Sequence, residues 1–245
     1  MANNKAQVTW IIVIGIFILI VAALIFYIAN YYKGKIGHGL EFEKSSIQNY
    51  INLCVKNTAE NGLKTLGKQG GYIKLENPLE TPNGGIAFLL KSNASKVPTI
   101  ENIESELSLY MKNNLNDCLK EFEDFKKQGW GVEKGELNSK ARINLHDVTF
   151  EVLYPIKVRY KDETIEVERS LITINVRLRY IYELINKIFD FRIKNSNSID
   201  RTELANYNFN IKVLSHNNFL IYVIDDKKSP IANQPYRFMF ALDFS

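Results

Sequence analysis

The sequence predicts an α+β protein that begins with one N-terminal transmembrane helix, followed by two amphipathic helices, a mainly antiparallel sheet and a third helix. Three observations predict this order. No charged residue occurs from Ala6 to Tyr32, apolar residues then recur three and four positions apart, and beyond Trp130 they alternate with polar ones. A long uncharged run is typical of a membrane span, the spacing of three and four is typical of amphipathic helices, and alternation is typical of half-buried strands. With 245 residues, the chain has room for one anchor and one domain.

We divide the chain at the points where its composition changes. The predicted parts are a short N-terminal segment (1–7), a transmembrane helix (8–32), a tether (33–41), a helical part of the ectodomain (42–129) and a β-rich part (130–245).

The first helix is long and apolar enough to predict a membrane span. Val8 to Ala29 is almost wholly apolar, and about 20 helical residues cross the ~30 Å hydrocarbon core of a bilayer. Trp10 and Tyr31 lie where the aromatic belts of the two interfaces would be. A cleaved signal peptide has a shorter apolar region that ends in small residues, and this segment has no such end. We therefore expect a single-pass protein of the cell membrane with the lipid bilayer as its partner.

Two amphipathic helices are expected after the tether. The first runs from about Phe42 to Leu66, where glycines end it, and the second follows Pro98, is capped by Thr99 and closes at Gly129. The apolar stripe of the first comprises Ile47, Ile51, Cys54, Val55, Thr58, Gly62 and Leu66, and that of the second comprises Ile103, Leu107, Met111, Leu115, Cys118, Phe122 and Phe125.

The two cysteines, Cys54 and Cys118, lie one on each of these stripes. They form either an inter-helix disulfide or two independent buried thiols, since a free cysteine packs well as a small apolar residue. Closing a loop of this length would stabilise the fold by roughly 4 kcal/mol. We predict the disulfide, which requires an oxidising compartment and so an extracytoplasmic C-terminal domain. The lysines after the span, Lys33, Lys35 and Lys44, favour the opposite orientation.

The β-rich part is expected to contain a hairpin with one irregularity. Pairing through a turn at Asp162-Glu163 places Tyr160 opposite Ile165 and Val158 opposite Val167, and pairs opposite charges on the other face. Because the apolar phase then slips near Pro155, we predict a β-bulge there. A helix with Ile181, Leu184, Ile185 and Ile188 follows, and strands are expected near 207–214, 219–224 and 236–244.

The N-terminal motif Lys5-Ala6-Gln7-Val8, directly before the apolar run, resembles the processing site of archaeal type IV pilin-like precursors. The resemblance implies cleavage between Ala6 and Gln7 and assembly of the retained helices into a filament core. Many family members have a glutamate where Ile11 stands here. The remainder of the chain looks like a group of uncharacterised archaeal single-pass anchored proteins, from which no activity carries over.

No catalytic motif occurs, so we predict no catalytic residue, no metal ligand and no cofactor. There is no phosphate-binding loop, dinucleotide fingerprint, zinc-protease motif or nucleophile elbow. His146-Asp147 is either a base with its orienting acid or a strand–turn pair. Asp225-Asp226 is either a cation site or part of a charged hairpin loop. Asn93-Ala94-Ser95 is a glycosylation acceptor motif.

Charge and composition limit the function classes. The formal net charge is +4, and basic residues are mixed with acidic ones almost everywhere, which argues against the concentrated basic face of a nucleic-acid-binding protein. The favoured function is a non-catalytic anchored surface protein, active in adhesion or in pilin-like self-assembly through its N-terminal helix. The alternative is an anchored subunit that binds a ligand or a protein partner within a membrane complex, and an anchored enzyme is third.

Overall fold

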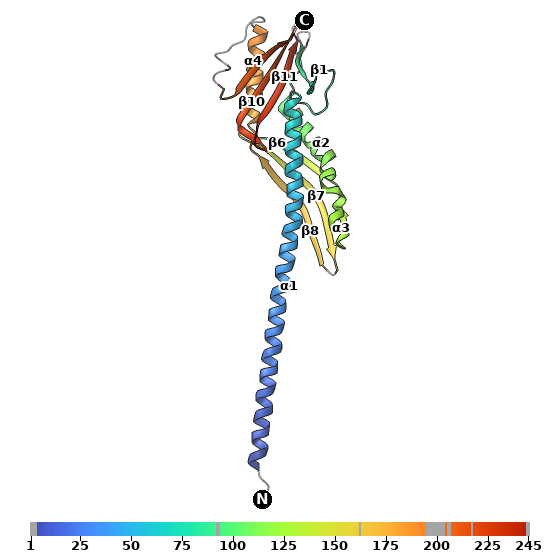
Figure 1. Cartoon of the computed structure of the whole chain (residues 1–245), viewed down its shortest axis with the longest axis vertical. Helices are drawn as coiled ribbons and strands as arrows, with labels where there is room; N and C mark the ends of the chain where they lie inside the picture. Colours follow the sequence, from blue (N-terminus) through green and yellow to red (C-terminus); the bar gives the residue numbers. More distant parts are fainter. Residues whose placement is uncertain are drawn as a thin grey trace. The chain divides into compact units, whose positions relative to one another are not determined.

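The computed structural model describes residues 4–91, 94–161, 163–194, 204, 207–216 and 218–243. The chain forms two compact units, Met1–Asn49 and Tyr50–Ser245. Helix α1 (Asn4–Lys68) runs through the boundary, so its residues from Tyr50 on belong to the second unit. The elements follow one another along the chain as coloured in Figure 1.

The first unit consists of the N-terminal part of α1. The helix covers residues 33–41, where the sequence predicted a tether, and it includes the backbone of the predicted processing motif Lys5–Val8. From Ile16 to Ile28 its large apolar side chains are exposed, with Val21 the least exposed at 38% and Leu19 the most exposed at 71%.

The predicted transmembrane helix over 8–32 requires correction. Within the part of the chain that the structure describes, no helix is both long enough and apolar enough to cross a membrane. The membrane part of the predicted fold class, the lipid bilayer as a partner, and a single-pass cell-membrane localisation with an extracytoplasmic domain are therefore not supported.

The second unit is an α+β fold built around the C-terminal turns of α1. The buried residues of this part of α1 recur three and four positions apart, because one face of the helix points into the core. The helix ends at Lys68, where Gly70 and Gly71 adopt positive φ and the Gly71 N–H bonds back to the Leu66 carbonyl at 2.9 Å. The buried residues on this face are Ile51, Cys54, Val55, Thr58, Ala59, Leu63 and Leu66.

The second amphipathic helix, α2 (Ile100–Leu119), begins as predicted and ends earlier. Thr99 is its N-cap, and the Thr99 side chain accepts a hydrogen bond from the Asn102 N–H at 3.2 Å. Left-handed backbone at Lys120, Glu121 and Phe122 then breaks the helix. This break turns Phe122 into the core, and the short helices η1 (Lys120–Phe122) and α3 (Glu123–Lys127) follow.

Among the described residues the strands form three sheets, and their ladders are antiparallel except for the β11–β3 pair. A hairpin of β1 (Leu79–Thr81) and β2 (Gly84–Ile86) stands alone. A five-stranded sheet has the order β4-β3-β11-β10-β9, and its strands are β3 (Phe88–Lys91), β4 (Ala94–Ser95), β9 (Asn210–His216), β10 (Phe219–Ile231) and β11 (Gln234–Asp243).

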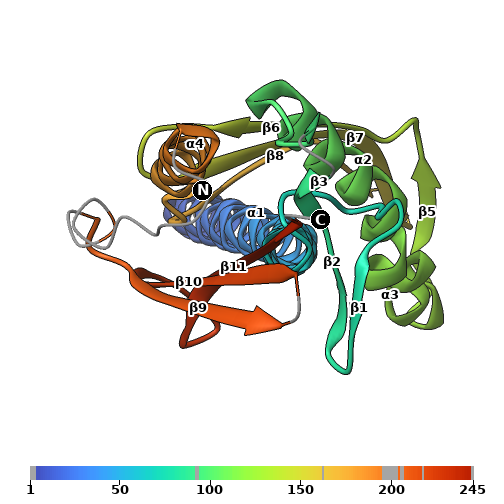
Figure 2. The same cartoon turned by 90° about the horizontal axis from the view of Figure 1, so that it is seen from above.

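The third sheet is centred on β7, which pairs with the other three strands. Its strands are β5 (Gly131–Lys134), β6 (Asn138–Ile143), β7 (Val148–Tyr160) and β8 (Glu163–Ile174). The residues of α1 from Tyr50 on lie between this sheet and the five-stranded sheet (Figure 2). Asn52 accepts a hydrogen bond from Ser170 of β8, and the Leu63 carbonyl accepts one from the hydroxyl of Tyr236 of β11.

The predicted β7–β8 hairpin and its bulge are confirmed, but the predicted register is wrong by two residues. Val158 pairs with Ile165 and Tyr160 with Glu163, because the chain turns one residue earlier, at Lys161. The register shifts between Leu153 and Ile156, the segment that contains Pro155. A shift of two residues keeps every side chain on its own face, so the predicted core face survives the error.

The third helix, α4 (Leu178–Lys194), is also confirmed, with all four predicted apolar residues buried. The strands expected at the C-terminus correspond to β9, β10 and β11, although β10 is longer than expected.

Candidate functional site

The disulfide between Cys54 and Cys118 is present, as predicted from the sequence. It joins α1 to α2 with a Cα–Cα distance of 5.5 Å. Beside it, the hydroxyl of Tyr50 donates to the Leu119 carbonyl at 3.0 Å, and the Tyr50 ring lies 5.3 Å from that of Phe125. The bond therefore fixes two helices whose cysteines are distant in the sequence.

The structure does not test the other two predicted modification sites. Asn93, the glycosylation acceptor, lies outside the described residues. Lys5, Ala6, Gln7 and Val8 are placed as helical backbone of α1 only. Glycosylation and processing therefore stay predictions.

His146 and Asp147 do not form a base with its orienting acid. The Asp147 carboxylate accepts hydrogen bonds from the Asn144 amide at 2.7 Å and from the Thr149 hydroxyl at 3.4 Å. The His146 ring lies 5.6 Å from the ring of Tyr180. Asp147 thus stabilises the turn between β6 and β7, as expected if His146-Asp147 is a strand–turn pair and not a catalytic pair. Over the described residues, no group of three or more His, Cys, Asp or Glu side chains could hold a metal ion.

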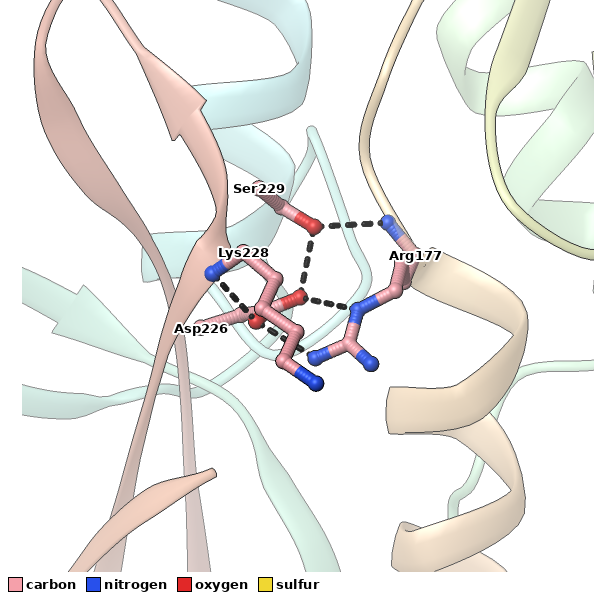
Figure 3. Close-up of polar contacts among 4 residues, drawn as sticks. All are labelled: Arg177, Asp226, Lys228 and Ser229. Carbon is pink, nitrogen blue, oxygen red and sulfur yellow. Dashed lines mark hydrogen bonds and ion pairs between the residues drawn. The ribbon is translucent and has the colours of Figure 1, made fainter. Parts of the chain in front are cut away.

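Asp226 lies at the centre of a buried polar cluster (Figure 3). Its side chain is fully buried, and its partner Arg177, in the link between β8 and α4, is 19% exposed. The Arg177 Nε and Nη2 atoms donate to the two carboxylate oxygens at 3.0 and 2.6 Å. The Ser229 hydroxyl and the Lys228 N–H donate at 2.5 and 3.0 Å.

These four donors saturate the carboxylate of Asp226, because each oxygen has two lone pairs and accepts two hydrogen bonds. The Ser229 oxygen in turn accepts the Arg177 backbone N–H at 3.0 Å. No lone pair of Asp226 is left for a substrate or cation, so this cluster serves to join β10 to the start of α4.

Asp225, the neighbouring residue, points to the other face of β10 and is also neutralised. Arg237 of β11 donates from Nε and Nη2 to its two carboxylate oxygens at 2.7 and 3.0 Å. The hydrogen bond to Asp225 raises the pKa of Arg237. With both carboxylates held by arginines inside a strand, the cation site and the charged hairpin loop considered from the sequence are both wrong.

A surface hollow of about 260 Å³ lies where the end of α1 meets the β10–β11 hairpin. We call it the basic hollow; its lining includes Lys64, Lys68, Asp225, Gln234, Tyr236 and Arg237. A second hollow, also about 260 Å³, is lined by two lysines and two glutamates among others, and we call it the balanced hollow. Its charged residues are Lys74, Glu76, Lys96 and Glu106.

Sequence reasoning missed Arg177, Ser229 and the two lysines of the basic hollow. A signal for the first pair existed in β10, where Tyr222, Ile224 and Asp226 alternate on one face. An acidic residue that alternates with buried residues is itself expected to be buried, and a buried carboxylate needs a cation or hydrogen-bond donors beside it. The pattern does not show which residues supply them.

Comparison with protein-family models, with curated proteins and with solved structures gave no match.

Proposed function

We propose that the protein is a non-catalytic structural protein that assembles with copies of itself through the apolar stretch Ile16–Ile28 of α1. The observation that carries the proposal is the exposure of this stretch, in which Phe17, Leu19 and Phe26 are each at least 66% exposed. Burying one such side chain gains about 1.5–3 kcal/mol. A soluble monomer seldom exposes a continuous apolar surface of this kind, so a partner surface is expected to cover it.

The partner is a second copy of the chain because of how the apolar residues are distributed. Consecutive residues of a helix are about 100° apart around its axis, so the unbroken run from Ile16 to Val21 presents apolar side chains in every direction. A groove on one different protein would cover a single stripe. Several identical helices packed side by side cover one another on all sides, as in a filament core or helix bundle.

The first test replaces one apolar side chain of this stretch by a charge. Leu24→Glu, at a leucine that is 53% exposed, should weaken self-association at least tenfold, about 1.4 kcal/mol, because an unpaired carboxylate would enter the contact. Sedimentation velocity of the full chain over a concentration series measures the association.

The matched control is Leu53→Glu, at a leucine that is 56% exposed on the same helix within the second unit. It should associate like the wild type. The proposal fails if the wild type is monomeric at all concentrations, if both variants associate equally well, or if the chain binds only a different protein or lipid vesicles and not itself.

The resemblance at Lys5–Val8 adds a second prediction to this proposal. Removal of the first six residues would free the apolar helix for packing without separating it from the α+β unit. We expect protein from its native cells to begin at Gln7, and we expect Lys5→Ala to reduce cleavage while Asn4→Ala leaves it unchanged. Mass spectrometry of the N-terminus checks this, and an intact Met1 in all molecules would contradict it.

A further inference from the structure

We propose that the basic hollow binds a phosphate group, either as free phosphate or as part of a phosphate monoester. The inference is independent of self-assembly, since every residue it uses lies in the second unit. Lys64 and Lys68 stand one helical turn apart in the last turns of α1, and Arg237 approaches from β11. Three cations thus line one hollow of about 260 Å³.

The charge of the hollow is not balanced within the protein. Its only acid among the lining residues, Asp225, is taken by Arg237 through two hydrogen bonds. Lys64 and Lys68 form no ion pair or hydrogen bond with a residue that the structure describes. Like charges four apart on a helix repel each other, so this pair costs stability unless an anion lies between them. The excess of two positive charges matches a phosphate monoester, which carries about −1.5 to −2 near neutral pH.

The donors of the hollow are held in place before any ligand binds. Asp225 fixes the plane of the Arg237 guanidinium and uses two of its five N–H groups, which leaves three for a ligand. The helix approaches β11 closely at Gly67, where an added Cβ would lie 2.3 Å from the Arg237 carbonyl oxygen. Tyr236 donates its hydroxyl to the Leu63 carbonyl at 3.1 Å, and burial raises the pKa of this phenol, so it stays protonated.

The carbonyl end of a helix would ordinarily repel an anion. Here three of the last four carbonyls of α1 are occupied, because Gln69, Gly70 and Gly71 donate their N–H groups to the carbonyls of Thr65, Gly67 and Leu66. This capping reduces the unfavourable contribution of the helix end and leaves the lysine and arginine charges dominant.

The balanced hollow provides an internal comparison. It has the same volume and also two lysines, but Glu76 and Glu106 offset them. Glu106 in addition accepts the backbone N–H groups of Ile73 and Lys74 at 2.9 and 3.3 Å. We therefore expect phosphate to bind at the basic hollow and not at the balanced one.

Equilibrium dialysis of the full chain against radiolabelled inorganic phosphate tests the site in any state of assembly. We expect saturable binding of one phosphate per chain, and at least a tenfold loss of affinity in the double variant Lys64→Ala/Lys68→Ala. The matched control Lys74→Ala/Lys96→Ala should bind as the wild type does, and Lys64→Arg/Lys68→Arg should retain binding because both charges remain.

The same dialysis with unlabelled glycerol phosphate as competitor separates the two sources of the phosphate group. Stronger competition than by inorganic phosphate assigns the site to monoesters, and equal competition assigns it to the free ion. The proposal is overturned if phosphate does not saturate the wild type, or if the two alanine double variants lose the same affinity, since that would show unspecific attraction to lysines.

Discussion

Arg177→Met should lower the free energy of unfolding by about 3–5 kcal/mol, because it leaves the fully buried Asp226 without its cation. The guanidinium contributes two of the four donors to this carboxylate, and it lies 5.0 Å from the ring of Phe209, a contact that is lost as well. Unfolding by urea, followed by circular dichroism, measures the change as a lower midpoint with an unchanged slope.

The adjacent pair provides a control for this prediction. Arg237→Met removes an arginine with the same two-bond geometry to Asp225, but the Arg237 side chain is 52% exposed. The Asp225 side chain is 10% exposed, and removal of the half-exposed arginine opens it further to water, so we expect a smaller loss than for Arg177→Met. Equal losses of unfolding free energy in the two variants would contradict the conclusion that the buried pair of Arg177 and Asp226 joins β10 to the start of α4.

Loss of the disulfide should have an effect of similar size. Cys54→Ala/Cys118→Ala should lower the free energy of unfolding by about 4 kcal/mol, because the unfolded chain regains the freedom of a loop closed over a sequence separation of 64. The bond also holds the buried face of α1 against α2, so reduced protein is expected to lose protection from proteolysis in both helices.

Reduction of the wild type separates the bond from the side chains. Wild type with reducing agent keeps both cysteines and should lose most of the 4 kcal/mol, whereas the double variant should not respond to the reagent. A loss below about 1 kcal/mol on reduction would show that packing alone holds the two helices together.

Several parts of the fold could be predicted because their signals are local. The apolar stripes of α1 and α2 repeat with the period of a helix, and each contains one cysteine, which was sufficient to predict the bond between Cys54 and Cys118. The alternation along β7 and the position of Pro155 predicted both the hairpin and its irregularity. Such patterns depend on the residues nearest in sequence and need no knowledge of the rest of the fold.

Other predictions failed where the local pattern does not decide the outcome. The β7–β8 register moved by two residues because the turn begins at Lys161, and both registers satisfy the same apolar pattern. The second helix was predicted to include Glu121 and Phe122. In the structure both residues have left-handed backbone, which breaks the helix and buries Phe122 in the core. The apolar N-terminal run predicted a membrane span that the described helix does not support.

By itself, the sequence determined the α+β class, the helix faces and the cysteine pair, since period, capping residues and residue type act over a few positions. Only the tertiary structure decided that Asp225 and Asp226 of one strand face two different arginines, and that Lys64 and Lys68 share a hollow with Arg237. Partners of this kind are chosen by how sheets and helices pack, because a buried charge is paired by whichever residue the fold brings within hydrogen-bond distance.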